Sequence, residues 1–345
     1  RINAEDPFRS FLPSTGRLVR FAPPKETMFQ ADTSKWFGVR VDTGVREGGE
    51  IPMFYDSMIA KLIVHGKDRN EAIAKMREAL NSFVIRGVSS NIPFQAALLA
   101  HPKFVSGQFN TGFIAENYAH GFKAEDVVHQ DPGFMVALAA FVRRKSRERA
   151  TSLSGQLRGF AVNAGKDYTV INLSAEGKHS YTDVNVTEFQ GETGSATVLV
   201  EGKEYKISSP SRLNDICIVG TVNGTAFSAQ VERGADKNPL ALRIQHNGTK
   251  IDAMVVSKRM AELHRMMPFK APPDMSRFLL SPMPGLLVDL AVVPGQKVQA
   301  GERLAVIEAM KMENVLFAAN DCVVGKVLAN KGESLSVDQP IIEFV

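Results

Sequence analysis

The sequence has very little cysteine and no long hydrophobic run. Cys217 and Cys322 are isolated, so they give neither a disulfide framework nor the CxxC spacing of a metal site, which fits a reducing compartment. No apolar stretch approaches the roughly 18 residues of a transmembrane helix, so we expect no membrane span. The chain opens on Arg1 without a start methionine and without a visible signal peptide. We therefore expect it to begin inside a larger protein.

Signatures of phosphate and nucleic-acid binding are also missing. The glycine-rich turn at 47–50 has neither a Walker-type lysine nor GxGxxG spacing. The net charge is only +4 and charges of both signs are interspersed, whereas a nucleic-acid binder more often has a concentrated basic face. A basic run at 143–149 ends an expected helix, where cations complement the macrodipole. We expect no nucleic-acid partner.

The length and the changing patterns predict several domains. A chain of 345 residues, 44% hydrophobic and 23% charged, is globular in composition and too long for one ordinary core. We expect a mixed α and β unit at 1–120, a helix followed by short strands at 121–265, a proline-rich linker at 266–276 and an all-β domain at 277–345. The predicted fold class is therefore multidomain, mainly β with α+β.

In the first unit, strands are expected at 17–21, 38–43 and 58–64. Asp68 followed by Glu71 has the character of a capping box. The helix after it should place Ile73, Met76, Leu80 and Phe83 on one apolar face. Further helices are expected at about 91–100 and 111–118.

The second unit reads as a helix at 132–149, with an apolar stripe, and about eight strands between 155 and 257. Two Asn-Gly pairs, at 223–224 and 247–248, are type I′ hairpin signals. Strands at this spacing predict a closed antiparallel barrel. It contains no nucleophile–base pair and no metal cluster, and we expect His179, His246 and His264 to be ordinary surface or core side chains.

The last domain contains an internal repeat with an offset of 37 residues, since Gly295 matches Gly332 (332 − 295 = 37) and Leu304 matches Ile341 (341 − 304 = 37). Each half reads as short alternating strands. Two half-sheets of this kind can fold on each other into a small flattened barrel. Their joint becomes a tight hairpin, and Lys311 sits on it.

A lysine on a rigidly held loop tip can carry a cofactor. When deprotonated, its amine can attack an activated acyl group and form an amide. Met310 and Met312 would flank it as two exposed soft apolar side chains, which are typical of a recognition surface. The alternative is an ordinary solvated lysine.

These residues carry a resemblance. The sequence AMKM at 309–312, in a duplicated half-barrel and preceded by SPMPG at 281–285, resembles the biotinyl domain of biotin-dependent carboxylases. Lipoyl domains share this fold, but their lysine is usually flanked by Asp and Ala. The resemblance implies that Lys311 carries biotin covalently and that Met310 and Met312 help a biotin protein ligase to recognise the hairpin.

The first unit resembles the C-terminal lobe of biotin carboxylase, an ATP-grasp enzyme, in three motifs: RINAEDP at 1–7, FLPS at 11–14 and YDSM at 55–58. The ATP-grasp half, which would bind ATP, Mg²⁺ and bicarbonate, is missing from this sequence. The resemblance assigns Arg1 to the bicarbonate and biotin site, where a guanidinium can stabilise anionic oxygen. The alternative is that Arg1 pairs with Glu5 or Asp6.

A helix and an eight-stranded barrel between these two units are similar to the subunit-contact domain of propionyl-CoA carboxylase-type α subunits. The resemblance implies an enzyme, an α subunit that works with a carboxyltransferase β subunit in a large hetero-oligomer. It would carboxylate propionyl-CoA to methylmalonyl-CoA, in a bacterial cytoplasm or a mitochondrial matrix. The alternatives are a methylcrotonyl-, acetyl- or geranyl-CoA carboxylase, or a non-catalytic lipoyl-type carrier.

Overall fold

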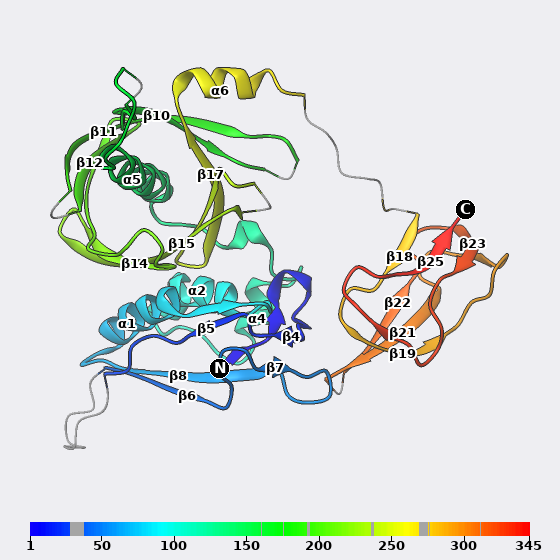
Figure 1. The fold of residues 1–345 in the computed structure, drawn as a ribbon. Helices are drawn as coiled ribbons and strands as arrows, with labels where there is room; N and C mark the ends of the chain where they lie inside the picture. The colour runs from blue at the N-terminus through cyan, green and yellow to red at the C-terminus, as the bar shows by residue number, and fades with distance from the viewer. Residues whose placement is uncertain are drawn as a thin grey trace.

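The structure is a computed structural model that describes residues 1–27, 38–159, 161–174, 176–191, 194–235, 238–268, 275, 277–310 and 312–345. Three units follow one another along the chain (Figure 1): an N-terminal lobe from β1 to α4 with the short η2 after it, a barrel from α5 to α6, and a C-terminal domain from β18 to β25. Most of the expected linker, including residues 269–274, lies outside the described residues.

The N-terminal lobe is a mixture of small antiparallel sheets and helices. Its largest sheet has the order β1-β8-β6, and β2-β3, β4-β7 and β5-β9 form separate two-stranded sheets. The elements are β1 (Ile2–Asn3), β2 (Glu5–Asp6), η1 (Pro7–Arg9), β3 (Leu12–Pro13), β4 (Gly16–Arg17), β5 (Arg20–Ala22), β6 (Gly38–Thr43), β7 (Glu50–Ile51), β8 (Met58–His65), α1 (Arg69–Ser82), β9 (Val84–Arg86), α2 (Ile92–Ala100), α3 (Pro102–Val105), α4 (Phe113–Asn117) and η2 (Ala124–Asp126).

The start of α1 confirms the predicted N-cap. The Asp68 carboxylate accepts the main-chain N–H of Glu71 at 2.8 Å, which satisfies one of the unpaired donors of the first turn. The Glu71 carboxylate reaches back to the N–H of Lys67 at 2.7 Å, one residue before the N-cap. The helix ends one residue earlier than expected, because Phe83 is its extended C-cap.

One strand prediction was wrong. The segment 17–21 is not a single strand, because Arg17 ends β4, which pairs with β7, and Arg20 begins β5, which pairs with β9. Leu18 and Val19 between them bond to different partners: the N–H of Leu18 donates to Gly49 and that of Val19 donates to Arg86. The chain therefore crosses from one strand pair to another within two residues.

The barrel confirms the predicted closed antiparallel architecture. Eight strands pair in sequence order and the last pairs with the first. The elements are α5 (Pro132–Thr151), β10 (Asp167–Asn172), β11 (Ser180–Gln190), β12 (Ser195–Val200), β13 (Lys203–Ser208), β14 (Cys217–Val222), β15 (Thr225–Arg233), β16 (Ala241–His246), β17 (Thr249–Val256) and α6 (Lys258–Arg265). Both Asn-Gly pairs form the hairpin turns with positive φ at each residue, +50° and +81° at 223–224, as a type I′ turn requires.

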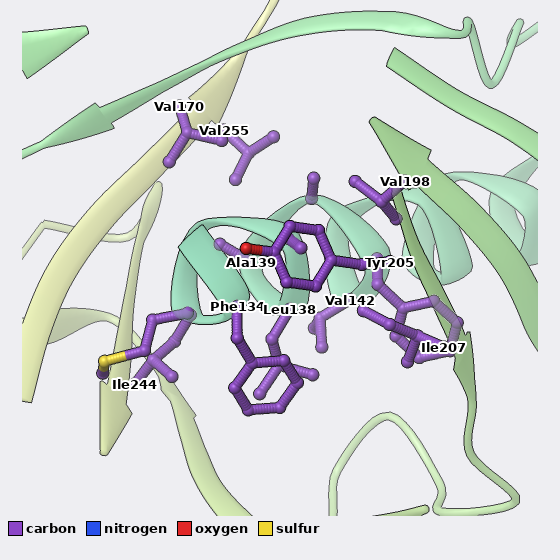
Figure 2. Close-up of a cluster of buried hydrophobic side chains, with 14 of the residues drawn as sticks. Phe134, Leu138, Ala139, Val142, Val170, Val198, Tyr205, Ile207, Ile244 and Val255 are labelled. Carbon is purple, nitrogen blue, oxygen red and sulfur yellow. The ribbon is translucent and has the colours of Figure 1, made fainter. Parts of the chain in front are cut away.

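Helix α5 fills the barrel rather than lying on its surface. Figure 2 shows its side chains among those of the surrounding strands. Because strands enclose it, the first half of α5 is buried on all sides instead of along one stripe. The labelled side chains are Phe134, Leu138, Ala139 and Val142 from α5, and Val170, Val198, Tyr205, Ile207, Ile244 and Val255 from the strands.

Basic side chains at the end of α5 donate hydrogen bonds to main-chain carbonyls at the rim of the barrel. The Lys145 ammonium donates to the carbonyls of Ser209 and Ser211 at 2.8 and 2.7 Å, and Arg147 donates to that of Asn163 at 3.0 Å. Burial lowers the pKa of Lys145 below its usual range. These cations therefore close one end of the barrel around the helix.

The C-terminal domain is two four-stranded sheets, ordered β18-β25-β23-β20 and β22-β21-β19-β24. The repeat offset of 37 residues carries β19 onto β23 and β20 onto β24. The two halves, however, do not form separate sheets as we expected, because each sheet takes two strands from each side of the hairpin. Strands β18 and β20 of the first half pair with β25 and β23, and β22 and β24 of the second half pair with β21 and β19. The strands are β18 (Phe278–Leu280), β19 (Gly285–Leu290), β20 (Lys297–Val298), β21 (Arg303–Ala309), β22 (Met312–Phe317), β23 (Cys322–Val327), β24 (Ser334–Leu335) and β25 (Pro340–Phe344).

Polar contacts fix the N-terminal lobe to the barrel. The amide nitrogen of Gln230 donates to the carbonyls of Asn81 and Phe83 at the end of α1, at 2.8 and 3.0 Å. Arg86 donates to the Gln230 side-chain oxygen at 2.7 Å and pairs with Glu232. In Figure 1, α1 and α2 lie against the end of the barrel near β14 and β15. Among the described residues, no helix has the length and apolar composition needed to cross a bilayer.

Candidate carrier hairpin

The hairpin that should carry the lysine is present at the joint of the repeat. Strands β21 and β22 pair with Ala309 opposite Met312, which leaves two residues for the turn. Met310 has a φ of +49°, the left-handed conformation that two-residue hairpins use at their first position. Lys311, the predicted carrier, lies outside the described residues.

The strands below this turn form a rigid support. Ile307 and Ala309 are buried in the core of the C-terminal domain. Gly285, at the start of β19, allows the close approach of strand β21. A Cβ at Gly285 would lie 2.6 Å from Ile307 Cγ2 and 2.7 Å from the carbonyl oxygen of Glu308. A turn held in this way is positioned by the scaffold and not by its own residues.

Met310 does not have the exposure that we expected. Its side chain is only 7% exposed and belongs to the hydrophobic core of the N-terminal lobe. Its main-chain N–H donates to the carbonyl of Met53 in the loop after β7, and Figure 1 shows the β21–β22 hairpin reaching this region. The sequence could not reveal this, because the contact joins two domains. Met312, by contrast, is 45% exposed as expected.

The N-terminal lobe and the C-terminal domain make two further contacts. The Arg9 guanidinium donates to the carboxylate of Asp338 at 3.1 Å and to the carbonyl of Pro282 at 3.2 Å. Leu12 packs against the core of the C-terminal domain. Burying a side chain of the size of Met310 contributes roughly 1.5–3 kcal/mol, whereas an exposed ion pair contributes about 0.2–1 kcal/mol. Met310 therefore dominates the contact, and Arg9 sets its orientation.

An open cleft lies between the two units, with a volume of about 700 Å³. Arg9 and Leu12 line one side, and Met283, Met312 and Asp338 line the other. The cleft begins directly beside the hairpin, because Met312 is the first residue of β22. It leaves space next to one flank of the turn, while the other flank is covered by the lobe.

Arg1, the candidate for anion stabilisation, is held through its main chain. Its carbonyl accepts from the side chains of Asn91, at 3.1 Å, and Gln95. The alternative partners predicted for its guanidinium accept hydrogen bonds from other residues: Glu5 accepts from Asn3 and Ser57, and Asp6 accepts the main-chain N–H of Phe8. No ion pair involving Arg1 occurs among the residues that the structure describes.

A histidine pair escaped the sequence analysis because its members are far apart in the chain. His129 Nε2 lies 2.7 Å from His246 Nδ1, and the N–H of Asp131 donates to His129 Nδ1 at 3.0 Å. Burial, reinforced by His129 and Arg77, lowers the pKa of His246 to about 3. Burial also lowers the pKa of His129. Both rings are therefore neutral and structural. The sequence analysis also expected His179 and His264 to be ordinary side chains. His264 Nδ1 lies 2.8 Å from Tyr181 Oη.

Family models match three consecutive segments of the chain. Residues 1–116 match the biotin carboxylase C-terminal domain, residues 135–270 the propionyl-coenzyme A carboxylase BT domain, and residues 278–344 the model described as biotin-requiring enzyme. The chain is thus similar, segment by segment and in this order, to domains described for a biotin carboxylase, for propionyl-coenzyme A carboxylase and for a biotin-requiring enzyme. The last match spans the hairpin described above and confirms the resemblance that its residues suggested.

Curated relatives extend the similarity over the full chain. The propionyl-CoA carboxylase alpha chain of Ruegeria pomeroyi is 41% identical over 354 residues, covering 100% of this chain and 50% of the relative. The mitochondrial propionyl-CoA carboxylase alpha chain of Mus musculus is 34% identical, with coverages of 100% and 45%. The mitochondrial methylcrotonoyl-CoA carboxylase subunit alpha of Mus musculus is 28% identical, with coverages of 100% and 46%. The chain thus spans about half the length of the curated relatives it matches.

Proposed function

We propose that this chain is the C-terminal part of the α subunit of a biotin-dependent acyl-CoA carboxylase, with propionyl-CoA as its substrate and methylmalonyl-CoA as its product. The observation that carries the proposal is the two-residue hairpin between Ala309 and Met312, at the joint of a 37-residue repeat and within the segment matched as a biotin-requiring enzyme. Lys311 follows Met310 in the sequence and is the proposed attachment residue. Domain boundaries at 120, 265 and 276 are part of the proposal.

The residues around the hairpin fit a tethered biotin. The turn is supported by buried strands, and the flank of Met312 opens into a cleft. When attached, biotin supplies a ureido nitrogen that accepts a carboxyl group and later releases it. Lys311 would provide the tether, and tethering raises effective concentration to the order of mM. Met310 and Met312 would be the flanks that a biotin protein ligase recognises.

Other parts of the chain would supply the site and the partner surface. Arg1, held by Asn91 and Gln95, would stabilise anionic oxygen during carboxylation. ATP, Mg²⁺ and bicarbonate would be bound mainly by an ATP-grasp half joined to the N-terminal lobe. The barrel would hold a carboxyltransferase β subunit in a large α/β assembly. The compartment would be a bacterial cytoplasm or a mitochondrial matrix.

Propionyl-CoA is favoured over other acyl-CoA substrates by two findings. The barrel segment matches a family named for propionyl-CoA carboxylase, and the identity to such alpha chains reaches 41%, against 28% for the methylcrotonoyl-CoA relative. Acetyl- and geranyl-CoA carboxylases have the same chemistry. The Met-Lys-Met flanks and the carboxylase-type lobe both disfavour a lipoyl-type carrier.

Two experiments test the proposal. First, the complex is captured from its source on avidin, and ATP-dependent fixation of labelled bicarbonate is compared with propionyl-, acetyl- and 3-methylcrotonyl-CoA. Preference for another acyl-CoA would change the proposed substrate and keep the proposed mechanism. Failure to bind avidin would contradict both the substrate and the mechanism. Second, Lys311→Ala should abolish biotin labelling and activity while the melting curve is preserved. An intact mass separates biotin from lipoate.

The role of Arg1 needs a separate readout. In the full-length enzyme, Arg1→Lys should slow biotin-dependent ATP cleavage by at least about tenfold, because a lysine lacks the planar fork of a guanidinium. Labelling of Lys311 should be unchanged. A variant with normal ATP cleavage would remove Arg1 from the site and leave the carrier role of Lys311 intact.

A further inference from the structure

We propose that the mouth of the barrel contains a binding site for a phosphate group, formed by Arg143 of α5 and Arg233 at the end of β15. Neither residue has a role in the proposed function, and the site does not depend on it. A pocket of about 80 Å³ opens at this end of the barrel, between α5 and strands β15, β16 and β17. The two arginines line it together with Ser146 and the aliphatic side chains of Leu240 and Val255.

The alternation of strand β15 directs Arg233 into this pocket. Successive side chains of a strand point to opposite faces, and Phe227, Ala229 and Val231 of β15 belong to the buried core of the barrel. Arg233 is two residues beyond Val231 and therefore lies on the same inner face. It is paired in register with Leu242 of β16, which also lines the pocket. A guanidinium is thus placed at the point where the apolar core of the barrel ends.

Arg143 reaches the same place from the helix. Ala139 and Ala140, one turn earlier on α5, are fully buried, whereas Arg143 is half-buried. Helix α5 therefore leaves the enclosed part of the barrel at Arg143. Ser146 lies three residues further along and also lines the pocket. Because residues three apart share one face of a helix, the guanidinium of Arg143 and the hydroxyl of Ser146 offer hydrogen-bond donors to one space.

The charges around Arg143 favour an anion. Burial, together with the positive charges of Arg147 and Arg233, lowers the pKa of Arg143 below its usual range. The neighbouring Arg144, by contrast, pairs with Glu148. In the part of the chain that the structure describes, neither Arg143 nor Arg233 forms an ion pair with a carboxylate. Two like charges are thus held beside a cavity, and an anion in the cavity would compensate both.

The size and charge of the site favour a phosphate group. A cavity of about 80 Å³ has roughly the volume of two to three water molecules, so it admits one small oxyanion but not a nucleotide. A phosphate monoester carries about −1.5 to −2 charges at pH 7, which matches two guanidinium groups better than the single charge of a carboxylate. Guanidinium groups also bind phosphate oxygens through paired N–H donors. The ligand is either free phosphate or the phosphate group of a larger molecule whose remainder stays outside the pocket.

The experiment titrates the whole chain with inorganic phosphate and, separately, with glycerol 3-phosphate, in isothermal titration calorimetry at constant ionic strength. Arg143→Gln and Arg233→Gln should each weaken binding by at least about tenfold, because charge-assisted hydrogen bonds are lost. Ser146→Met keeps both positive charges and a good helix former but fills the pocket, so it should abolish binding. Arg259→Gln, which removes an exposed arginine of α6, is the matched control and should bind like the wild type.

The variants separate a pocket from a general attraction to basic side chains. Binding that is equal in all variants, or that survives Ser146→Met, would show that surface charge alone attracts the anion and would overturn the proposal. Absence of binding to the wild type would overturn it as well. In each of these cases the proposed role of Lys311 is unaffected.

Two further readouts locate the site and identify the ligand. Hydrogen exchange of the peptides containing Arg143 and Leu240 should slow when phosphate is added, while exchange in the segment 312–317 of the C-terminal domain should stay the same. Tighter binding of glycerol 3-phosphate than of inorganic phosphate would identify the ligand as a phosphate monoester. The reverse order would identify it as free phosphate. Slower exchange elsewhere but not at these two peptides would place the anion outside the pocket and contradict the proposal.

Discussion

The guanidinium of Arg9 lies 3.1 Å from the carboxylate of Asp338, although 329 residues separate them in the sequence. Their side chains are 43% and 62% exposed, so this pair is accessible to salt, unlike the buried side chain of Met310. The two contacts hold the same interface by different physical means, and they can be tested separately.

We expect the ionic contact to respond to salt. Raising the ionic strength from 0.1 to 1 M shortens the Debye length from about 10 to about 3 Å. The amide of Met310 should then exchange faster by about twofold, measured by mass spectrometry at constant pH. Arg9→Gln lacks the ion pair and should lose this response. An equal response in both proteins would show that the salt acts elsewhere.

We expect the pair of His129 and His246 to make the protein less stable in mild acid. Because His129 accepts the N–H of Asp131 at Nδ1, its neutral ring carries the proton on Nε2 and donates to His246. The pKa of His246 is about 3 in the folded state, below the roughly 6.5 of an unfolded histidine. Between these values the unfolded chain binds more protons, so the free energy of unfolding falls as the pH falls. The titration of His246 alone should lower the free energy of unfolding by about 2 kcal/mol at pH 5.

The measurement is urea denaturation at pH 7.5 and pH 5, compared with His246→Gln. This variant cannot titrate, so its difference between the two pH values should be smaller by about the same amount. His179→Gln is the control for replacing a histidine by glutamine outside the pair. If His246→Gln keeps the pH dependence of the wild type, other groups cause the acid sensitivity.

Local and repeating features of this chain could be predicted from its sequence. The Asp68 cap, the Asn-Gly turns and the 37-residue offset depend on residues close together or on a pattern that the chain repeats. The position of α5 could not be predicted in the same way. An apolar stripe is typical of any helix that packs with one face on a core. The other faces of α5 are buried as well because the closed barrel surrounds it.

The candidate site also has a part that the sequence predicts and a part that it does not. The hairpin and its lysine follow from the joint of the repeat. The burial of Met310, however, arises where two units meet, and the neutral pair of His129 and His246 joins residues 117 apart in the sequence. A single sequence contains no signal for such contacts, because each partner is an ordinary residue in its own segment. Met310 was therefore expected on the surface, where it would lie if the C-terminal domain were alone.

Gly285 should be required for the support of the hairpin. Its replacement by alanine would place a Cβ 2.6 Å from Ile307 and 2.7 Å from the carbonyl oxygen of Glu308, which is backbone and cannot move freely. We expect Gly285→Ala to destabilise the C-terminal domain by about 1–3 kcal/mol, measured by thermal denaturation, and to reduce labelling of Lys311. Gly44→Ala, where nothing lies within 4 Å, is the control and should melt like the wild type.

Gln230 should be required to join the lobe to the barrel. Its side chain is only 5% exposed, and it bonds to the carbonyls of Asn81 and Phe83 and to Arg86. Gln230→Leu would keep most of the volume but leave two carbonyl groups and a guanidinium without these partners. An unsatisfied buried polar group costs about 1–3 kcal/mol, so we expect a loss of at least that size in urea denaturation followed by circular dichroism.

The exposed Gln108 offers the matched control, because Gln108→Leu removes the same group where water can replace it. The effect of Gln230→Leu should concentrate at the end of α1, where hydrogen exchange should accelerate while exchange in the core of the C-terminal domain stays the same. Uniform acceleration along the chain would mean that Gln230 stabilises the barrel itself. Unchanged exchange at α1 would mean that the lobe is held to the barrel by its other contacts, such as the pair of Arg86 and Glu232.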